Sequence, residues 1–300
     1  MIAHVAEATE AKGRVIVRLT GDREAGAVRA AFEIAEAYAA AVELLVVDDE
    51  NIERALRFPF VRTLSFHGRE TFRVSPRFHA VGHHKLVSDA ERLARRLSEE
   101  RNVAFKASVS TDDPRRAISV ACAAEGPWNL VVLPAADHRR SLAEARAILD
   151  EDLGATAVAL IPPSGNQDRL YARNPASLAV LLEDVGSISA LLQAADRFAV
   201  QAAALHGRAR IAMFCVGPQG RPGAGEIEAA ARLVLADRPH SSLLIEARFA
   251  GAVPAGADLT PYLDRLAPGL VLARCNLDGP TPETLALLLR RLRPLLILAR

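Results

Sequence analysis

Residues 13–19, GRVIVRL, form an apolar run of strand length, and residues 177–184, SLAVLLED, repeat it in the second half of the chain. A helical pattern of apolar residues follows each run, over residues 24–41 and 188–207. Apolar strands that alternate with helices are typical of parallel sheets that are covered on both faces. The two runs therefore predict an α/β fold that is built twice.

The same order of elements continues through both halves. The further strand candidates are VELLVVDD, VAFKASVS, NLVVLPA and TAVALIPP in the first half and ARIAMFCVG, SSLLIEARF, GLVLARC and RPLLILAR in the second. Helical patterns separate them, and Gly207 is expected to end the helix at 188–207. We predict two tandem five-stranded parallel-sheet lobes of Rossmann-like α/β/α type, residues 1–164 and 175–300, joined by the polar stretch 164–176.

The first lobe carries an insertion, residues 57–86, where the second has only GPQGRPGAGE. Within it, residues 62–68 and 70–75 are expected to form a small hairpin. Its phenylalanines and arginines could stack on nucleic-acid bases, cover a ligand as a lid, or pack against protein. The chain's net charge of +1 favours protein over nucleic acid. We predict a partner interface at the evenly spaced Phe60, Phe66, Phe72 and Phe78.

Histidines in the same stretch raise the alternative of a metal site. His79 and His83 are four residues apart, but Gly82 between them weakens a helix. No HExxH motif and no paired cysteine supports a metal, and we predict none. The next helix is expected to begin at Ser88, with Ser88 and Glu91 forming a capping box.

Cysteine usage and hydropathy set the expected compartment. Cys122, Cys215 and Cys275 lie far apart in apolar runs, which predicts buried free thiols and a reducing, cytoplasmic setting. Cys275, which follows Arg274 at a strand end, is the thiol to test for reactivity. No apolar run reaches the length that spans a bilayer, so we expect no membrane association.

Motifs of catalysis are absent from the sequence. It holds no GxSxG elbow, no P-loop and no GxGxxG after a strand, which predicts a protein that is not an enzyme. Residues 137–141, DHRRS, follow a predicted strand and start a helix. They could hold an anion with arginines and a helix N-terminus, or Asp137 could simply cap the helix.

The tandem arrangement resembles the universal stress protein family. Its nucleotide-binding members carry an acid at the end of the first strand and a G-x2-G-x9-G-[ST] signature between the fourth and fifth strands. Here Gly154 is the only glycine in residues 133–156, and Gly279 is the only glycine in residues 272–294. The resemblance implies that the fold is kept without this signature. It also implies that the two lobes pair through their last strands, TAVALIP and LLILA, so that one chain mimics a dimer.

The function expected from this resemblance is that of a non-enzymatic stress-response or regulatory protein. It would act by binding a protein partner, without a cofactor and without nucleic acid, and the Phe-rich insertion could join two chains into a homodimer. The alternative is a sensor that binds ATP, AMP or another anion in lobe one. Its expected ligand residues are Thr20, Gly21, Asp22, Asp137, His138, Arg139, Arg140 and Ser141. A third reading, an enzyme on the same architecture, lacks a supporting motif.

Overall fold

A computed structural model describes most of the 300 residues. The described ranges are 13–19, 25–48, 50–58, 60–64, 71–72, 76–124, 128–151, 153–162, 174–217, 223–236, 244–254, 257–275 and 280–300. Contacts divide the chain into two compact units, residues 1–129 and 130–300. The lobes predicted from the repeat, 1–164 and 175–300, follow a different division and stay a prediction.

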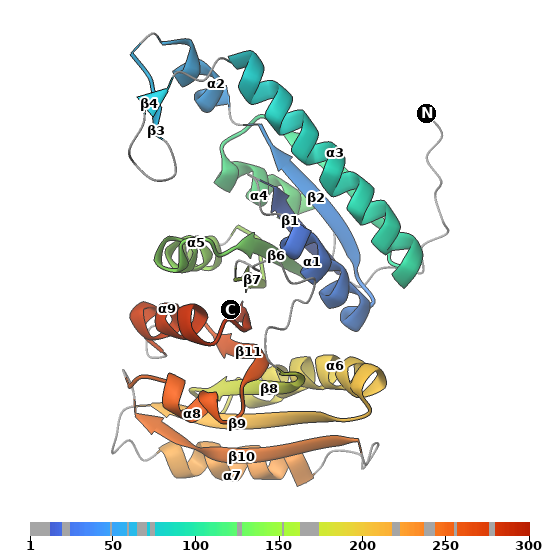
Figure 1. Ribbon diagram of the computed structural model, residues 1–300. Helices are drawn as coiled ribbons and strands as arrows, with labels where there is room; N and C mark the ends of the chain where they lie inside the picture. Colours follow the sequence, from blue (N-terminus) through green and yellow to red (C-terminus); the bar gives the residue numbers. More distant parts are fainter. Residues whose placement is uncertain are drawn as a thin grey trace. The chain divides into compact units, whose positions relative to one another are not determined.

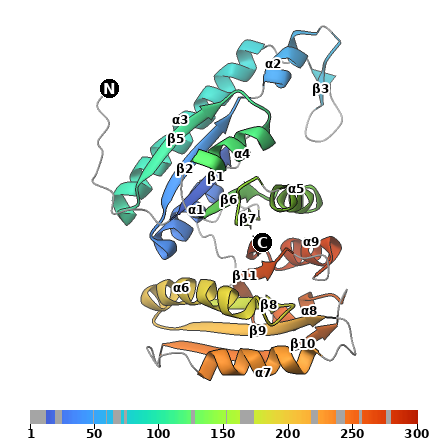
Figure 2. The ribbon, with the colours of Figure 1, turned by 180° about the vertical axis from the view of Figure 1, so that it is seen from behind.

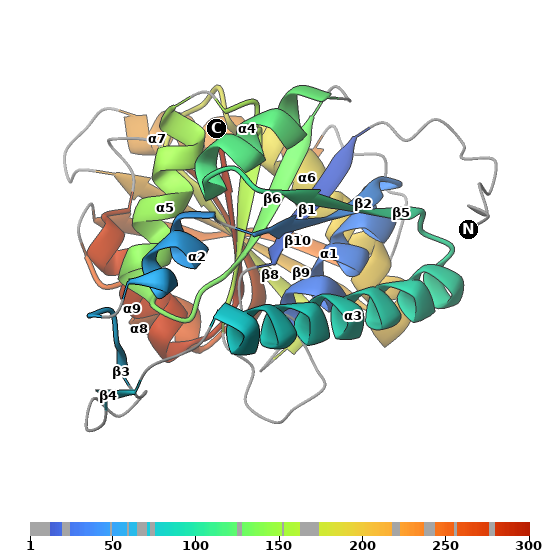
Figure 3. The ribbon, with the colours of Figure 1, turned by 90° about the horizontal axis from the view of Figure 1, so that it is seen from above.

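The first unit contains three parallel strands of a sheet, in the order β1-β2-β5. Its elements are β1 (Arg14–Leu19), α1 (Ala25–Tyr38), β2 (Ala41–Val47), α2 (Glu50–Arg57), β3 (Thr63–Leu64), β4 (Thr71–Phe72), α3 (Pro76–Arg101), β5 (Phe105–Ser110) and α4 (Pro114–Ala124). Helices α1 and α3 cover one face of the strands and α4 the other (Figure 3). The apolar residues of β1 and α1 are buried between these layers.

The second unit contains seven strands in the order β10-β9-β8-β11-β12-β7-β6. Its elements are β6 (Asn129–Pro134), α5 (His138–Asp150), β7 (Ala157–Ile161), β8 (Asn174–Leu182), α6 (Ile188–His206), β9 (Ala209–Gly217), α7 (Gly223–Ala236), β10 (Ile245–Pro254), α8 (Thr260–Asp264), β11 (Pro268–Arg274), α9 (Pro282–Arg291) and β12 (Leu295–Ala299). Helices α6 and α7 contact each other on one face of β8–β12, and α8 and α9 do so on the other (Figure 1, Figure 2).

The expected alternation of strands and helices is confirmed in both halves of the chain. The structure has five strands and four helices from β8 to β12, and the same series from β1 to β7 with α2, β3 and β4 added. All strand pairs within β8–β12 are parallel. Gly207 ends α6 with φ 76°, as predicted. The fold is thus α/β and Rossmann-like, with two tandem sets of five strands.

The predicted pairing of the last strands is also confirmed. β7 and β12 run antiparallel, and Leu160 stands opposite Leu296. Both side chains are fully buried. The C-terminus extends this pairing, because the backbone N–H of Arg300 donates to the carbonyl of Thr156 at 3.1 Å. This antiparallel pair joins the fifth strand of each repeat.

The insertion of the first repeat holds the predicted hairpin and one correction. β3 pairs with β4 in antiparallel fashion, which confirms the hairpin. The following helix, however, begins at Pro76 and not at Ser88, so the proposed capping box lies inside α3. Proline at the first position of a helix loses no hydrogen bond, and α3 gains contacts with α1 and β5. Glycine inside a helix costs about 1 kcal/mol, and α3 continues through Gly82.

A buried charged network crosses the sheet of the first unit. Arg14 and Glu43 are each 4% exposed, and Arg14 Nη1 lies 2.7 Å from Glu43 Oε2. Ser108 Oγ donates to Glu43 Oε1 at 2.7 Å. Arg14 Nη2 donates to the carbonyl of Ala121 and to Asn129 Oδ1, the latter at 3.2 Å. The network therefore ties β1, β2, β5 and α4 to Asn129, the last residue of the first unit.

Candidate functional site

The residues predicted to bind a ligand at the start of α5 are brought together only in part. Asp137 is the N-cap of α5, and its Oδ1 accepts from the backbone N–H groups of Arg139 and Arg140 at 3.1 and 3.2 Å. Ser141 is buried, and its Oγ donates to the carbonyl of Pro134 at 3.4 Å. Asp137 and Ser141 thus have structural partners, and the first helical amides already hold a carboxylate.

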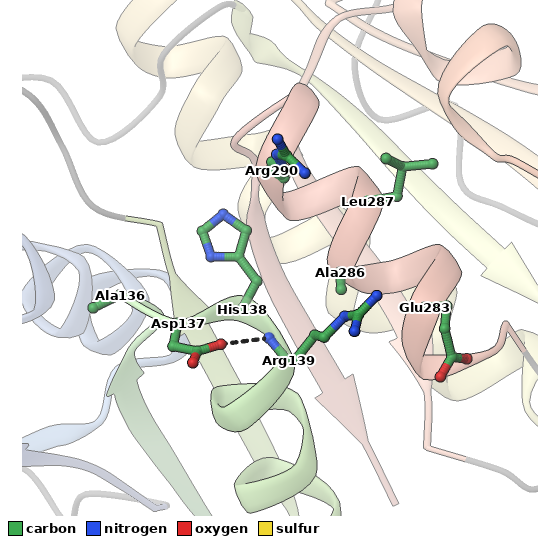
Figure 4. A pocket seen from close by; sticks show the side chains of 8 residues that line it. All are labelled: Ala136, Asp137, His138, Arg139, Glu283, Ala286, Leu287 and Arg290. Atoms are coloured by element: carbon green, nitrogen blue, oxygen red, sulfur yellow. Dashed lines mark hydrogen bonds between the residues drawn. The ribbon is translucent and has the colours of Figure 1, made fainter.

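A groove lies between the start of α5 and helix α9 (Figure 4). Its volume is about 720 Å³. The lining residues are Ala136, Asp137, His138 and Arg139 from the first repeat and Glu283, Ala286, Leu287 and Arg290 from the second. Of the five predicted residues, Asp137, His138 and Arg139 line this α5–α9 groove, while Arg140 and Ser141 do not. The α9 residues were not anticipated.

The acid at the end of the second repeat's first strand is held in a structural cluster. Asp184 Oδ2 lies 3.0 Å from Arg274 Nη1, at the end of β11. Asp184 Oδ1 accepts from the backbone N–H of Ser187 at 2.8 Å. Both carboxylate oxygens therefore have protein partners. The resemblance to nucleotide-binding universal stress proteins placed their acid at the end of this strand.

Two phenylalanines of the insertion are exposed. Phe58 is 51% and Phe60 is 76% exposed, and their rings stack with centroids 5.4 Å apart. They follow the end of α2, whose last turn carries Arg54 and Arg57. We call Phe58 and Phe60 the aromatic pair. Phe60 was predicted as a partner contact. Its ring is exposed at the surface, as such a contact requires.

Several predicted site residues fall outside the described part of the chain. Thr20, Gly21, Asp22 and Phe66 are among them, and so are the side chains of Phe72 and Phe78. Their proposed roles remain predictions. Among the described residues no cluster of histidine, cysteine or carboxylate side chains could hold a metal ion, and no helix is long and apolar enough to cross a membrane.

The three cysteines are free thiols, and Cys122 and Cys215 are buried. Burial raises the pKa of the Cys122 thiol to about 11 from its ordinary 9.0, although nearby Arg14 opposes the shift. Burial also raises the pKa of Cys215 and of Cys275. These environments disfavour a reactive thiolate at neutral pH.

We expect iodoacetamide at pH 8 to modify the folded chain far more slowly than the urea-unfolded chain, with Cys122 slowest. The Cys122 thiol stays protonated in the folded chain up to a higher pH than in the unfolded chain. The stabilisation that follows from this shift is complete below pH 9.0 and is lost as the pH rises toward about 11. Mass spectrometry of the time course gives the rate at each cysteine. Modification of Cys275 at the same rate in both states would contradict this expectation.

Comparison with known proteins gives structural matches alone. No family model and no curated protein matches the sequence. The cytoplasmic domain of a prokaryotic cation chloride cotransporter matches with a TM-score of 0.59 and 13% identity, over 96% of this chain and 95% of that one. A provisionally assigned universal stress protein from Pseudomonas aeruginosa UCBPP-PA14 matches with a TM-score of 0.54 and 16% identity, over 97% and 93%. The chain has a universal-stress-type fold.

A third solved structure fits the same conclusion. It is a protein of unknown function from Pseudomonas aeruginosa PAO1, with a TM-score of 0.55 and 15% identity, and the match covers 97% of this chain and 92% of that one. Each match runs through both repeats. The universal-stress-type fold of this chain is therefore tandem, as the sequence predicted. At these identities the likeness concerns the fold.

Proposed function

We propose that this chain is a non-enzymatic regulatory protein of universal-stress type that binds a protein partner through the aromatic pair. The observation that carries the proposal is the exposure of Phe58 and Phe60, at 51% and 76%. Exposed aromatic side chains next to arginines are enriched at protein interfaces. The pair belongs to the segment that distinguishes the first repeat from the second.

The nucleotide chemistry of the family has little support in this chain. Neither repeat carries the glycine signature that lets backbone amides approach phosphates. In the second repeat, Arg274 and Ser187 engage the acid Asp184. We infer that the fold serves as a scaffold without nucleotide turnover. Hydrolysis of ATP or of another nucleotide by the purified chain would contradict this part of the proposal.

The partner surface is tested by removing the aromatic pair. A protein that co-purifies with the intact chain from its native cells should be lost from the variant Phe58→Ser/Phe60→Ser. The reason is that a hot-spot residue contributes about 2 kcal/mol or more to the free energy of binding, which is roughly a thirtyfold change in affinity. Quantitative mass spectrometry of the purified complexes measures the loss.

The matched control changes exposed apolar residues elsewhere. Val200 and Leu205 of α6 are 60% and 70% exposed, so Val200→Ser/Leu205→Ser removes apolar surface of the same kind. This variant should keep the partner. Equal recovery of every co-purifying protein by both variants and the intact chain would count against the aromatic pair as a binding surface.

A further inference from the structure

The α5–α9 groove combines a hollow with unpaired cationic side chains. At about 720 Å³ it lies within the usual size range of small-molecule sites. Arg139 reaches into it from α5 and Arg290 from α9, and His138 lies near Arg290 (Figure 4). Within the described part of the chain, neither arginine forms an ion pair. Two guanidinium groups from different helices therefore face one cavity.

The groove also carries two carboxylates, Asp137 and Glu283. Asp137 is engaged by the backbone amides of Arg139 and Arg140. Glu283, in the first turn of α9, lies at the end of the groove away from His138 and Arg290 (Figure 4). It forms no ion pair among the described residues. The end near His138 and Arg290 is thus cationic, and the end near Glu283 combines the Arg139 guanidinium with a carboxylate acceptor (Figure 4).

The chemistry of a fitting ligand follows from this distribution. Arginine side chains bind phosphate and carboxylate groups with paired N–H donors. Between the two ends lie Ala136, Ala286 and Leu287, which suit an uncharged body. A hydroxyl or amine on that body could donate to Glu283.

We propose that the α5–α9 groove binds a small organic anion. Arg290 and His138 hold its phosphate or carboxylate group, Arg139 donates to a second acceptor group farther along the groove, and Glu283 accepts from a hydroxyl or amine near Arg139 (Figure 4). The site differs from a glycine-rich phosphate loop because side chains of both repeats make it, while Asp137 occupies the helix amides. It goes beyond the proposed partner binding and does not depend on the aromatic pair.

The test is isothermal titration of the full chain at low ionic strength with two probes, inorganic pyrophosphate and citrate. Binding of either probe supports the site, and the tighter one identifies a phosphate or a carboxylate ligand. Arg290→Ala and Arg139→Ala should each weaken binding by about tenfold or more, since each removes a charged hydrogen-bond donor. Glu283→Gln should instead tighten it by about two- to fivefold, because a repelling charge is lost.

The matched control is Arg140→Ala. Arg140 is exposed and next to Arg139 on α5, yet it does not line the groove. Its replacement should leave affinity unchanged. Equal weakening by Arg140→Ala and Arg290→Ala would show unspecific attraction to surface charge and overturn the proposal. Absence of binding heat with both probes would overturn it as well.

Discussion

Replacing Glu43 with alanine should lower the free energy of unfolding by about 3–5 kcal/mol, because it leaves a buried guanidinium without its counter-charge. Arg14 and Glu43 are almost fully removed from solvent, and their side chains meet at 2.7 Å. Ser108 would lose its acceptor as well. Urea unfolding, monitored by circular dichroism, measures the change in the free energy of unfolding.

The control for this effect is an ion pair of the same type at the surface. Glu246 lies 3.4 Å from Arg210, and the two side chains are 58% and 50% exposed. Glu246→Ala should cost about 0–1 kcal/mol. A similar small loss for Glu43→Ala would show that water reaches Arg14. The double change Arg14→Met/Glu43→Leu should recover most of the stability, since no unpaired charge then remains.

Replacing Leu160 with aspartate should cost more than about 4 kcal/mol, because a carboxylate would be buried without a partner. Leu160 lies in β7 between Leu133 of β6 and Leu296 of β12. All three side chains are fully buried. The change therefore disrupts the packing of the antiparallel pair of β7 and β12, which joins the two repeats. Denaturant unfolding together with gel filtration shows the loss of stability and any aggregation.

Leu160→Met separates the charge effect from a general sensitivity of this strand. Methionine has nearly the same volume, and such exchanges usually cost less than about 1.5 kcal/mol. Free energies of unfolding of Leu160→Asp and Leu160→Met that differ by less than about 1 kcal/mol would contradict the burial of Leu160. In that case β7 would not be covered by β12 as the structure has it.

The elements of the fold were predictable because buried parallel strands leave a strong pattern in the sequence. GRVIVRL and SLAVLLED are apolar runs of strand length, and both became strands. The start of α3 was not predictable from local signals. Gly82 and a plausible cap at Ser88 favoured a late start, whereas the helix begins at Pro76, and proline suits the first turn of a helix.

The candidate site could be predicted only in part, because its residues come from two distant segments of the chain. Residues 137–139 were predicted from their place after a strand, and they line the groove. Arg290 and Glu283 belong to the other repeat, so no local spacing connects them with Arg139. The correspondence between NLVVLPA and GLVLARC, combined with pairing of the last strands, was the signal that could have placed α9 beside α5. The Arg14–Glu43 pair likewise depends on strand register, in which β1 and β2 align Ile16 with Glu43.

Partner binding by the aromatic pair is tested most directly by photo-cross-linking in the native cells, with benzoylphenylalanine in place of Phe60 or, as the control, Leu205. Both positions are strongly exposed, at 76% and 70%. We expect a discrete cross-linked species from position 60 that is absent from position 205 and contains a second protein or a second copy of this chain. Identical cross-linking patterns from the two positions, or none from position 60, would contradict the claim that the aromatic pair binds a protein partner.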